Sequence, residues 1–99
     1  MIIEGLEHGV VRLAEPFDFR RFKLVLHGDG AKGAQSWSGI AVLDARDGLV
    51  SIDLVPTLAG CPDDASWNQG YADMIAKARE LGWIDAERHA IRAHIEWNP

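Results

Sequence analysis

Residues 62–83 read PDDASWNQGYADMIAKARELGW, and this stretch decides the fold because it carries the clearest long helical pattern in the chain. At about 100° per residue, its large apolar side chains fall within an arc of about 120°, as in an amphipathic helix. These side chains belong to Trp67, Tyr71, Met74, Ile75, Ala78 and Leu81. The spacing therefore predicts a helix over 66–82 whose apolar stripe is buried against the rest of the domain.

Both ends of this expected helix carry recognisable signals. Ser66 followed three residues later by Gln69 has the spacing of a capping box, in which the serine side chain satisfies a free N–H group. Gly82 is placed to adopt the left-handed conformation that ends many helices. Gly70 fits less well, because glycine within a helix costs about 1 kcal/mol relative to alanine. We expect Gly70 to mark the close approach of another backbone segment.

The size and composition of the chain indicate one globular domain over residues 1–99. It is 47% hydrophobic and 25% charged, which is ordinary for a globular protein. The net charge of −5 opposes binding to nucleic acid and to anionic membrane, because both need a basic surface. The densest basic group is Arg20, Arg21 and Lys23, and so small a cluster is usually a solvated face. The sequence shows no signal peptide and no transmembrane run, so we expect a cytoplasmic location.

Short apolar runs between turn residues predict two hairpins. Residues 1–7 and 10–13 form the first. Residues 37–44 and 49–55 form the second, and residues 45–48 join them with an Asp-Gly pair, which is a strong turn signal.

Two further segments complete the expected sheet. Residues 90–97 alternate most regularly, with apolar side chains on one side and Arg92, His94 and Glu96 on the other. Residues 17–27 are ambiguous. We interpret them as a strand because they lead through glycine-rich turn residues towards another strand, and the alternative is a second helix over 17–28.

These elements predict an α+β fold. We expect a mostly antiparallel sheet of about five to six short strands, with the long helix 66–82 on one face. One helix cannot cover so wide a sheet, because neighbouring strands lie about 4.8 Å apart. Either the sheet curls, or residues 17–28 supply a second helix, or another copy of the chain covers the remainder.

The best candidate binding residues follow by elimination, because the helix stripe is committed to the core. Arg92 and His94 stand two apart on a rigid strand, and rigid elements hold site geometry well. Asp53 lies on the expected neighbouring strand, and His27 and Asp29 lie at the start of a glycine-rich loop. We expect any site to form around these five residues and to prefer a small anionic or polar ligand.

Motifs for cofactor or metal chemistry are weak. The run 27–33 matches neither the P-loop nor the dinucleotide fingerprint, so we interpret it as a hairpin connection. The histidines lack the close spacing of a zinc site, and the single cysteine, Cys61, supplies no paired ligand. The acidic neighbours of Cys61 oppose a nucleophilic role. We expect no cofactor and no metal.

The function that best fits these patterns is a non-catalytic binding or protein-interaction module. It would use the open face of the sheet, or the loops around Trp37, with a tryptophan as anchor. One alternative is a small enzyme that uses His27 or His94 with Asp29 or Asp53 as an acid–base pair. Another alternative is a structural subunit whose partner is a second copy of the chain.

Overall fold

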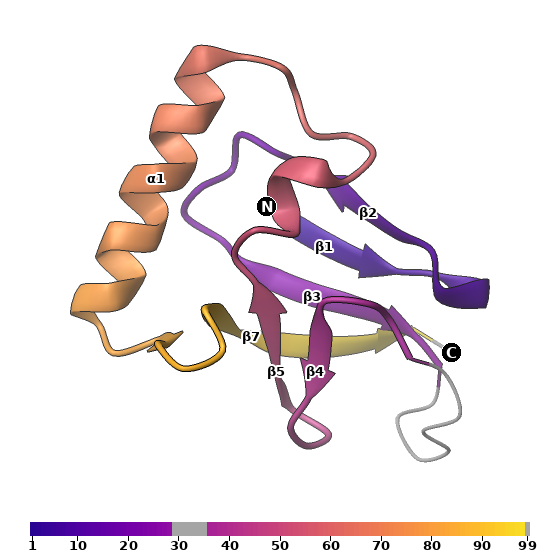
Figure 1. Cartoon of the computed structure of the whole chain (residues 1–99). Coiled ribbons are helices and arrows are strands. Elements are labelled where there is room, and N and C mark those ends of the chain that lie inside the picture. The colour runs from indigo at the N-terminus through magenta and orange to yellow at the C-terminus, as the bar shows by residue number, and fades with distance from the viewer. Residues whose placement is uncertain (29–35, 99) are drawn as a thin grey trace.

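The computed structural model describes residues 1–28 and 36–98 (Figure 1). The elements in chain order are β1 (Ile2–Gly5), η1 (Glu7–Gly9), β2 (Val11–Ala14), β3 (Lys23–His27), β4 (Ile40–Val42), β5 (Asp47–Ser51), η2 (Val55–Thr57), α1 (Ala65–Glu80), β6 (Ile84–Asp85) and β7 (Ala90–Asn98). The expected α+β class is confirmed, with one α-helix and one sheet in the described part of the chain.

The sheet is mixed, and the expectation of a mostly antiparallel sheet of five to six strands is wrong. Its order is β2-β1-β3-β7-β5-β4, and β6 pairs with β7 off this path, which makes seven strands. β3 is parallel to both of its neighbours, whereas the outer pairs are antiparallel. Strand signals identify extended segments, but the direction of each pair depends on how the connections cross the sheet. The two-residue strand β6 is too short to give a pattern.

Residues 17–28 contain a strand, so the strand interpretation is confirmed and the second helix is wrong. β3 begins at Lys23, and Leu24 and Leu26 are fully buried between β1 and β7. Side chains two apart lie on the same face of a strand, and this alternation places both leucines in the core.

The helix α1 begins and is capped differently from the prediction. Asp64 precedes it, and the carboxylate Oδ1 accepts from the N–H groups of Ser66 at 2.7 Å and Trp67 at 3.1 Å. Ser66 therefore lies inside the first turn, and the capping box is wrong. Aspartate is as good a cap as serine, and its position relative to the first turn decides which one acts. Gly82 has a φ of 79° just beyond the helix, as expected.

The first half of α1 is fastened to the core by aromatic side chains. Trp67 is 1% exposed, and its ring stacks on Tyr71 with centroids 5.0 Å apart. The indole N–H of Trp67 donates to the carbonyl of Pro16 at 2.8 Å, and the hydroxyl of Tyr71 donates to the carbonyl of Ile52 at 2.8 Å. Gly70 faces the ring of Phe19, since a Cβ there would lie 2.4 Å from ring atom Cε2. The close neighbour of Gly70 is thus a side chain and not a second backbone.

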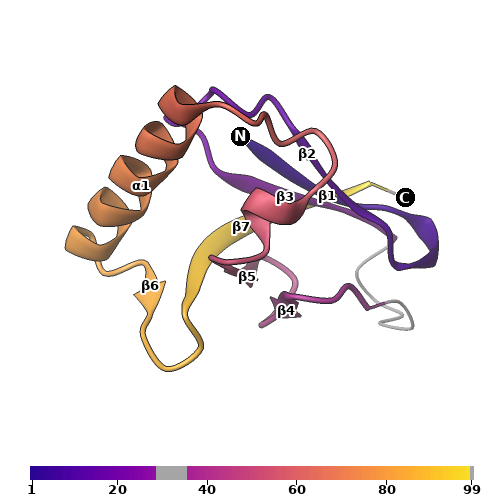
Figure 2. The same cartoon turned by 45° about the horizontal axis from the view of Figure 1, so that its top comes forward.

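The helix stands at one side of the sheet, next to the ends at which β3 and β7 begin (Figures 1 and 2). The inward side chains of β7, including Ile91 and Ile95, are buried, which confirms the strand expected over 90–97. No helix within residues 1–28 and 36–98 is long and apolar enough to cross a membrane.

Candidate binding groove

A groove of about 970 Å³ lies between the second half of α1, residues 19–23 and the first half of β7. Its apolar lining includes Phe22, Met74, Leu81, Trp83 and Ile91. Leu81 is 50% exposed and Trp83 is 52% exposed, so two large apolar side chains stand open to solvent beside it. A volume near this size is at the upper end of the range for ligand-binding clefts.

The groove exists because one edge of β7 is interrupted. β3 pairs with β7 from His94 onward, and β6 pairs with it only at Ala90 and Ile91. Arg92 and Ala93 lie between these two partners on that edge. Four consecutive residues, 91–94, line the groove, although alternate side chains of a strand point to opposite faces. The groove therefore passes around this edge, from the helix side of the sheet to its outer face.

The rim of the groove is cationic although the chain is acidic. Five of the ten Lys and Arg residues line it, namely Arg20, Arg21, Lys23, Lys77 and Arg92. Only one of the fifteen Asp and Glu residues does so, namely Asp47. The positive charge of the molecule is thus concentrated at this groove.

Three of these cations have acidic neighbours. Arg92 binds Asp47 at 3.0 Å, Lys23 lies 3.6 Å from Glu96, and Lys77 lies 3.8 Å from Glu80. Arg20 and Arg21 form no ion pair with any described residue and are exposed. Exposed pairs of this kind contribute little to stability, so most of the rim charge remains available to an anionic ligand.

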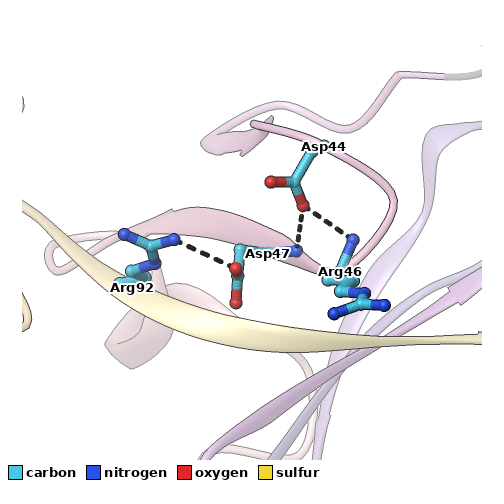
Figure 3. A network of polar contacts seen from close by, with 4 residues as sticks. All are labelled: Asp44, Arg46, Asp47 and Arg92. Atoms are coloured by element: carbon cyan, nitrogen blue, oxygen red, sulfur yellow. Dashed lines mark hydrogen bonds and ion pairs between the residues drawn. The ribbon is translucent and has the colours of Figure 1, made fainter.

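A fixed turn holds Asp47 and, through it, Arg92 (Figure 3). Oδ1 of Asp44 accepts from the N–H groups of Arg46 at 2.7 Å and Asp47 at 2.8 Å. These backbone hydrogen bonds lower the pKa of Asp44, because they favour the carboxylate form. The carbonyl of Arg46 accepts from the N–H of Ile95 at 2.7 Å, which ties the turn to β7. The guanidinium of Arg92 is therefore oriented by a rigid hairpin.

Two of the five residues proposed from the sequence line the groove, namely Arg92 and His94. β5 and β7 are neighbours, as that proposal required, but the register places Asp47 opposite His94. Asp53 lies beyond the end of β5, where its carboxylate is 3.4 Å from Nε2 of His89. The site therefore has a different acidic residue from the one expected.

The other two proposed residues are not brought to the groove in the described structure. His27 ends β3 and is paired in register with Asn98, at the far end of the strand from Lys23. Asp29 lies outside the described residues, as does most of the glycine-rich run 27–33. Within the described chain no ion pair joins His27 or His94 to Asp53. The acid–base pairs of the enzyme alternative stay a prediction.

Sequence reasoning missed Asp47 and Trp83. Asp47 was assigned to the turn over 45–48, but β5 begins at Asp47 itself, which points the carboxylate at Arg92. Trp83 was expected to fold over the last helical turn, and Trp37 was the proposed anchor. Trp37 is buried, and its indole N–H donates to the carbonyl of Leu6 at 2.8 Å. The exposed tryptophan is Trp83.

Other reactive groups in the described chain lie apart from the groove. Burial raises the pKa of the Cys61 thiol, and the charge of Asp63 adds to this effect, so the thiol is disfavoured as a nucleophile. Among the described residues no three His, Cys, Asp or Glu side chains gather closely enough to hold a metal ion. Comparisons of the chain with protein-family models, with curated proteins and with solved structures found no match.

Proposed function

We propose that this chain is a non-catalytic protein-interaction module, and that it binds an acidic segment of another protein in the groove between α1 and β7. The observation that carries the proposal is the pairing of an apolar floor with a cationic rim in a chain of net charge −5. A partner segment with acidic and large apolar side chains would complement both features.

The apolar side of the groove favours a macromolecular segment over a simple anion. Leu81 and Trp83 are half exposed, and Met74 is only partly buried. Covering apolar surface stabilises a complex by about 25 cal/mol per Å². A free anion would use the rim and leave these side chains in water.

The charge distribution supports selectivity for an acidic partner. Arg20 and Arg21 are free of ion pairs with described residues, and guanidinium groups stay protonated at any physiological pH. They bind carboxylates as forked donors and do not exchange protons with a substrate. The acidic remainder of the surface repels the same partner elsewhere, which directs binding to the groove.

An NMR titration tests this function. The isotope-labelled chain is titrated with a short capped peptide in which Glu and Asp alternate with Leu and Phe, and separately with a peptide that has Lys in place of each acid. We expect amide shifts at residues 19–23, 77–83 and 91–94 with the acidic peptide only, and weaker binding as salt is added. Equal binding of both peptides, or no shifts at the groove, would contradict the proposal.

A matched pair of charge reversals sharpens the test. Arg21→Glu changes an exposed cation on the rim, and Arg79→Glu changes an exposed cation of α1 that does not line the groove. We expect Arg21→Glu to weaken binding of the acidic peptide about tenfold while Arg79→Glu leaves it within about twofold. Equal losses in the two variants would indicate attraction by overall charge and not by this groove.

A further inference from the structure

Trp83 differs from the other tryptophans in the bonding of its indole N–H. Three indole groups donate to backbone carbonyls at 2.8 Å, from Trp37 to Leu6, from Trp67 to Pro16 and from Trp97 to Ala45. Trp83 has no hydrogen-bond partner among the described residues and is 52% exposed. A tryptophan that presents both its ring and its N–H to solvent has the features of an interface anchor.

Arg92 lies directly opposite Trp83. The N–H of Arg92 donates to the carbonyl of Trp83 at 2.8 Å, which extends the antiparallel register of β6 with β7 by one residue. Opposite residues of an antiparallel pair point to the same face, with Cβ atoms about 5 Å apart. The indole N–H and the guanidinium are therefore neighbouring donors on the outer face of the sheet.

Both residues also line a second, smaller hollow. This hollow has a volume of about 310 Å³, and its lining includes Leu43 and Leu49 on the side of β4 and β5. Trp83 and Arg92 line both the groove and the hollow. The two depressions thus meet at this pair of side chains and form one continuous track across the edge of β7.

We infer that the acidic partner segment is extended and crosses Trp83 from the groove into the hollow, with one carboxylate held jointly by the indole N–H of Trp83 and the guanidinium of Arg92. This inference rests on the proposed function and adds the location of the anchoring contact. Asp47 takes one nitrogen of Arg92, Nη2, and a guanidinium carries five N–H donors, so others remain to bind a carboxylate. Leu43, which is 45% exposed, gives the segment an apolar contact beyond the anchor.

The hollow also contains one acid, which limits where the carboxylate can lie. Asp85 lines it, and its Oδ1 accepts from the N–H of Arg88 at 3.0 Å. A partner carboxylate is attracted to the Trp83 and Arg92 side of the hollow and repelled from the Asp85 side. The partner segment therefore has its acidic residue over Trp83 and an apolar residue after it.

A double-mutant cycle tests the anchor. Trp83→Phe keeps an aromatic ring but removes the N–H, and the probe peptide is used with a central Asp or with Ala at that position. We expect Trp83→Phe to weaken the Asp peptide about tenfold and to leave the Ala peptide within about twofold. Phe17→Leu is the control variant, because Phe17 is an exposed aromatic that lines neither depression. It is expected to leave both affinities unchanged.

The indole signals give a second measurement on the unaltered chain. The Asp peptide is expected to shift the Nε1–H signal of Trp83, while the signals of the three bonded indoles stay in place. If the acidic peptide fails to bind the unaltered chain at all, the proposed function itself is overturned. If it binds and responds to Arg21→Glu, but the Trp83→Phe effect is the same for both peptides, only the anchor is overturned. Equal shifts of Trp83 with free glutarate would also overturn an extended segment as the occupant.

Discussion

The two halves of α1 carry one continuous apolar stripe, yet they have different surroundings. In the first half, Trp67 and Tyr71 are buried, stacked on each other and hydrogen-bonded to distant carbonyls. Towards the end of the helix, Met74 is partly buried and Leu81 is half exposed beside the groove. A stripe of apolar residues therefore shows which face of a helix avoids water, but not whether this chain alone covers that face.

The largest expected effect tests the buried half. Trp67→Ala should lower the free energy of unfolding by about 3–5 kcal/mol, because it removes a fully buried ring and leaves a cavity. Trp83→Ala should lower it by about 0.5 kcal/mol, because that ring is 52% exposed. Urea unfolding of both variants measures the difference. Similar losses would show that the two halves of the stripe are equally committed to the core.

The next effect compares two adjacent residues of the same helix. Ile75 is 8% exposed in the core, whereas Met74 lines the groove. Ile75→Ala should cost about 3 kcal/mol, and Met74→Ala about 1 kcal/mol, since less of its side chain loses contacts. Met74→Ala should instead weaken the acidic peptide. The comparison fails if Met74 is the more costly change in chemical unfolding.

A smaller effect concerns the close contact that fastens the first half. Gly70→Ala would normally favour a helix by about 1 kcal/mol. Here the new methyl would meet the ring of Phe19 at 2.4 Å, so we expect a net loss of about 1 kcal/mol. In a Phe19→Ala background the same change should become neutral or stabilising. If Gly70→Ala stabilises the unaltered chain, Phe19 moves away at little cost.

The smallest effect is the pH dependence of the helix cap. Hydrogen bonds from the Ser66 hydroxyl and from the N–H groups of Trp67 and Ser66 lower the pKa of Asp64. Because the folded pKa lies below the unfolded one, this carboxylate stabilises the fold above its unfolded pKa, and the contribution disappears as pH falls through the folded pKa. The melting temperature of the chain should therefore exceed that of Asp64→Ala at neutral pH, and the gap should narrow in acid. A constant gap across this range would exclude the charged cap.

Local patterns were sufficient for the elements but not for their neighbours. The helix, the β4–β5 hairpin and β7 were predictable because periodicity and turn residues are local properties. The order of strands was not, because the parallel pairs of β3 join residues far apart in the chain. The cap on α1 was missed for a related reason: Asp64 and Ser66 are both good caps, and only the path of the preceding loop selects between them.

The site was predicted in part. Arg92 and His94 were found because a strand alternates, and this property is also local. Asp47 was missed because a shift in where β5 begins moves that residue from turn to strand. The rim was missed because Arg20 and Arg21 look like an ordinary solvated cluster until Lys77 and Arg92 are seen beside them.

The central position of β7 has a consequence for how the chain folds. β7 lies between β3 and β5, so the group β2-β1-β3 and the hairpin β4–β5 are joined in the sheet only through it. During synthesis these two parts exist before residues 90–98 are available, and each has an edge of unpaired backbone groups. Pairings between such distant segments form slowly because a long loop must close first. The order of synthesis therefore leaves a period in which those open edges can pair with other chains, and insertion of the last strand ends it.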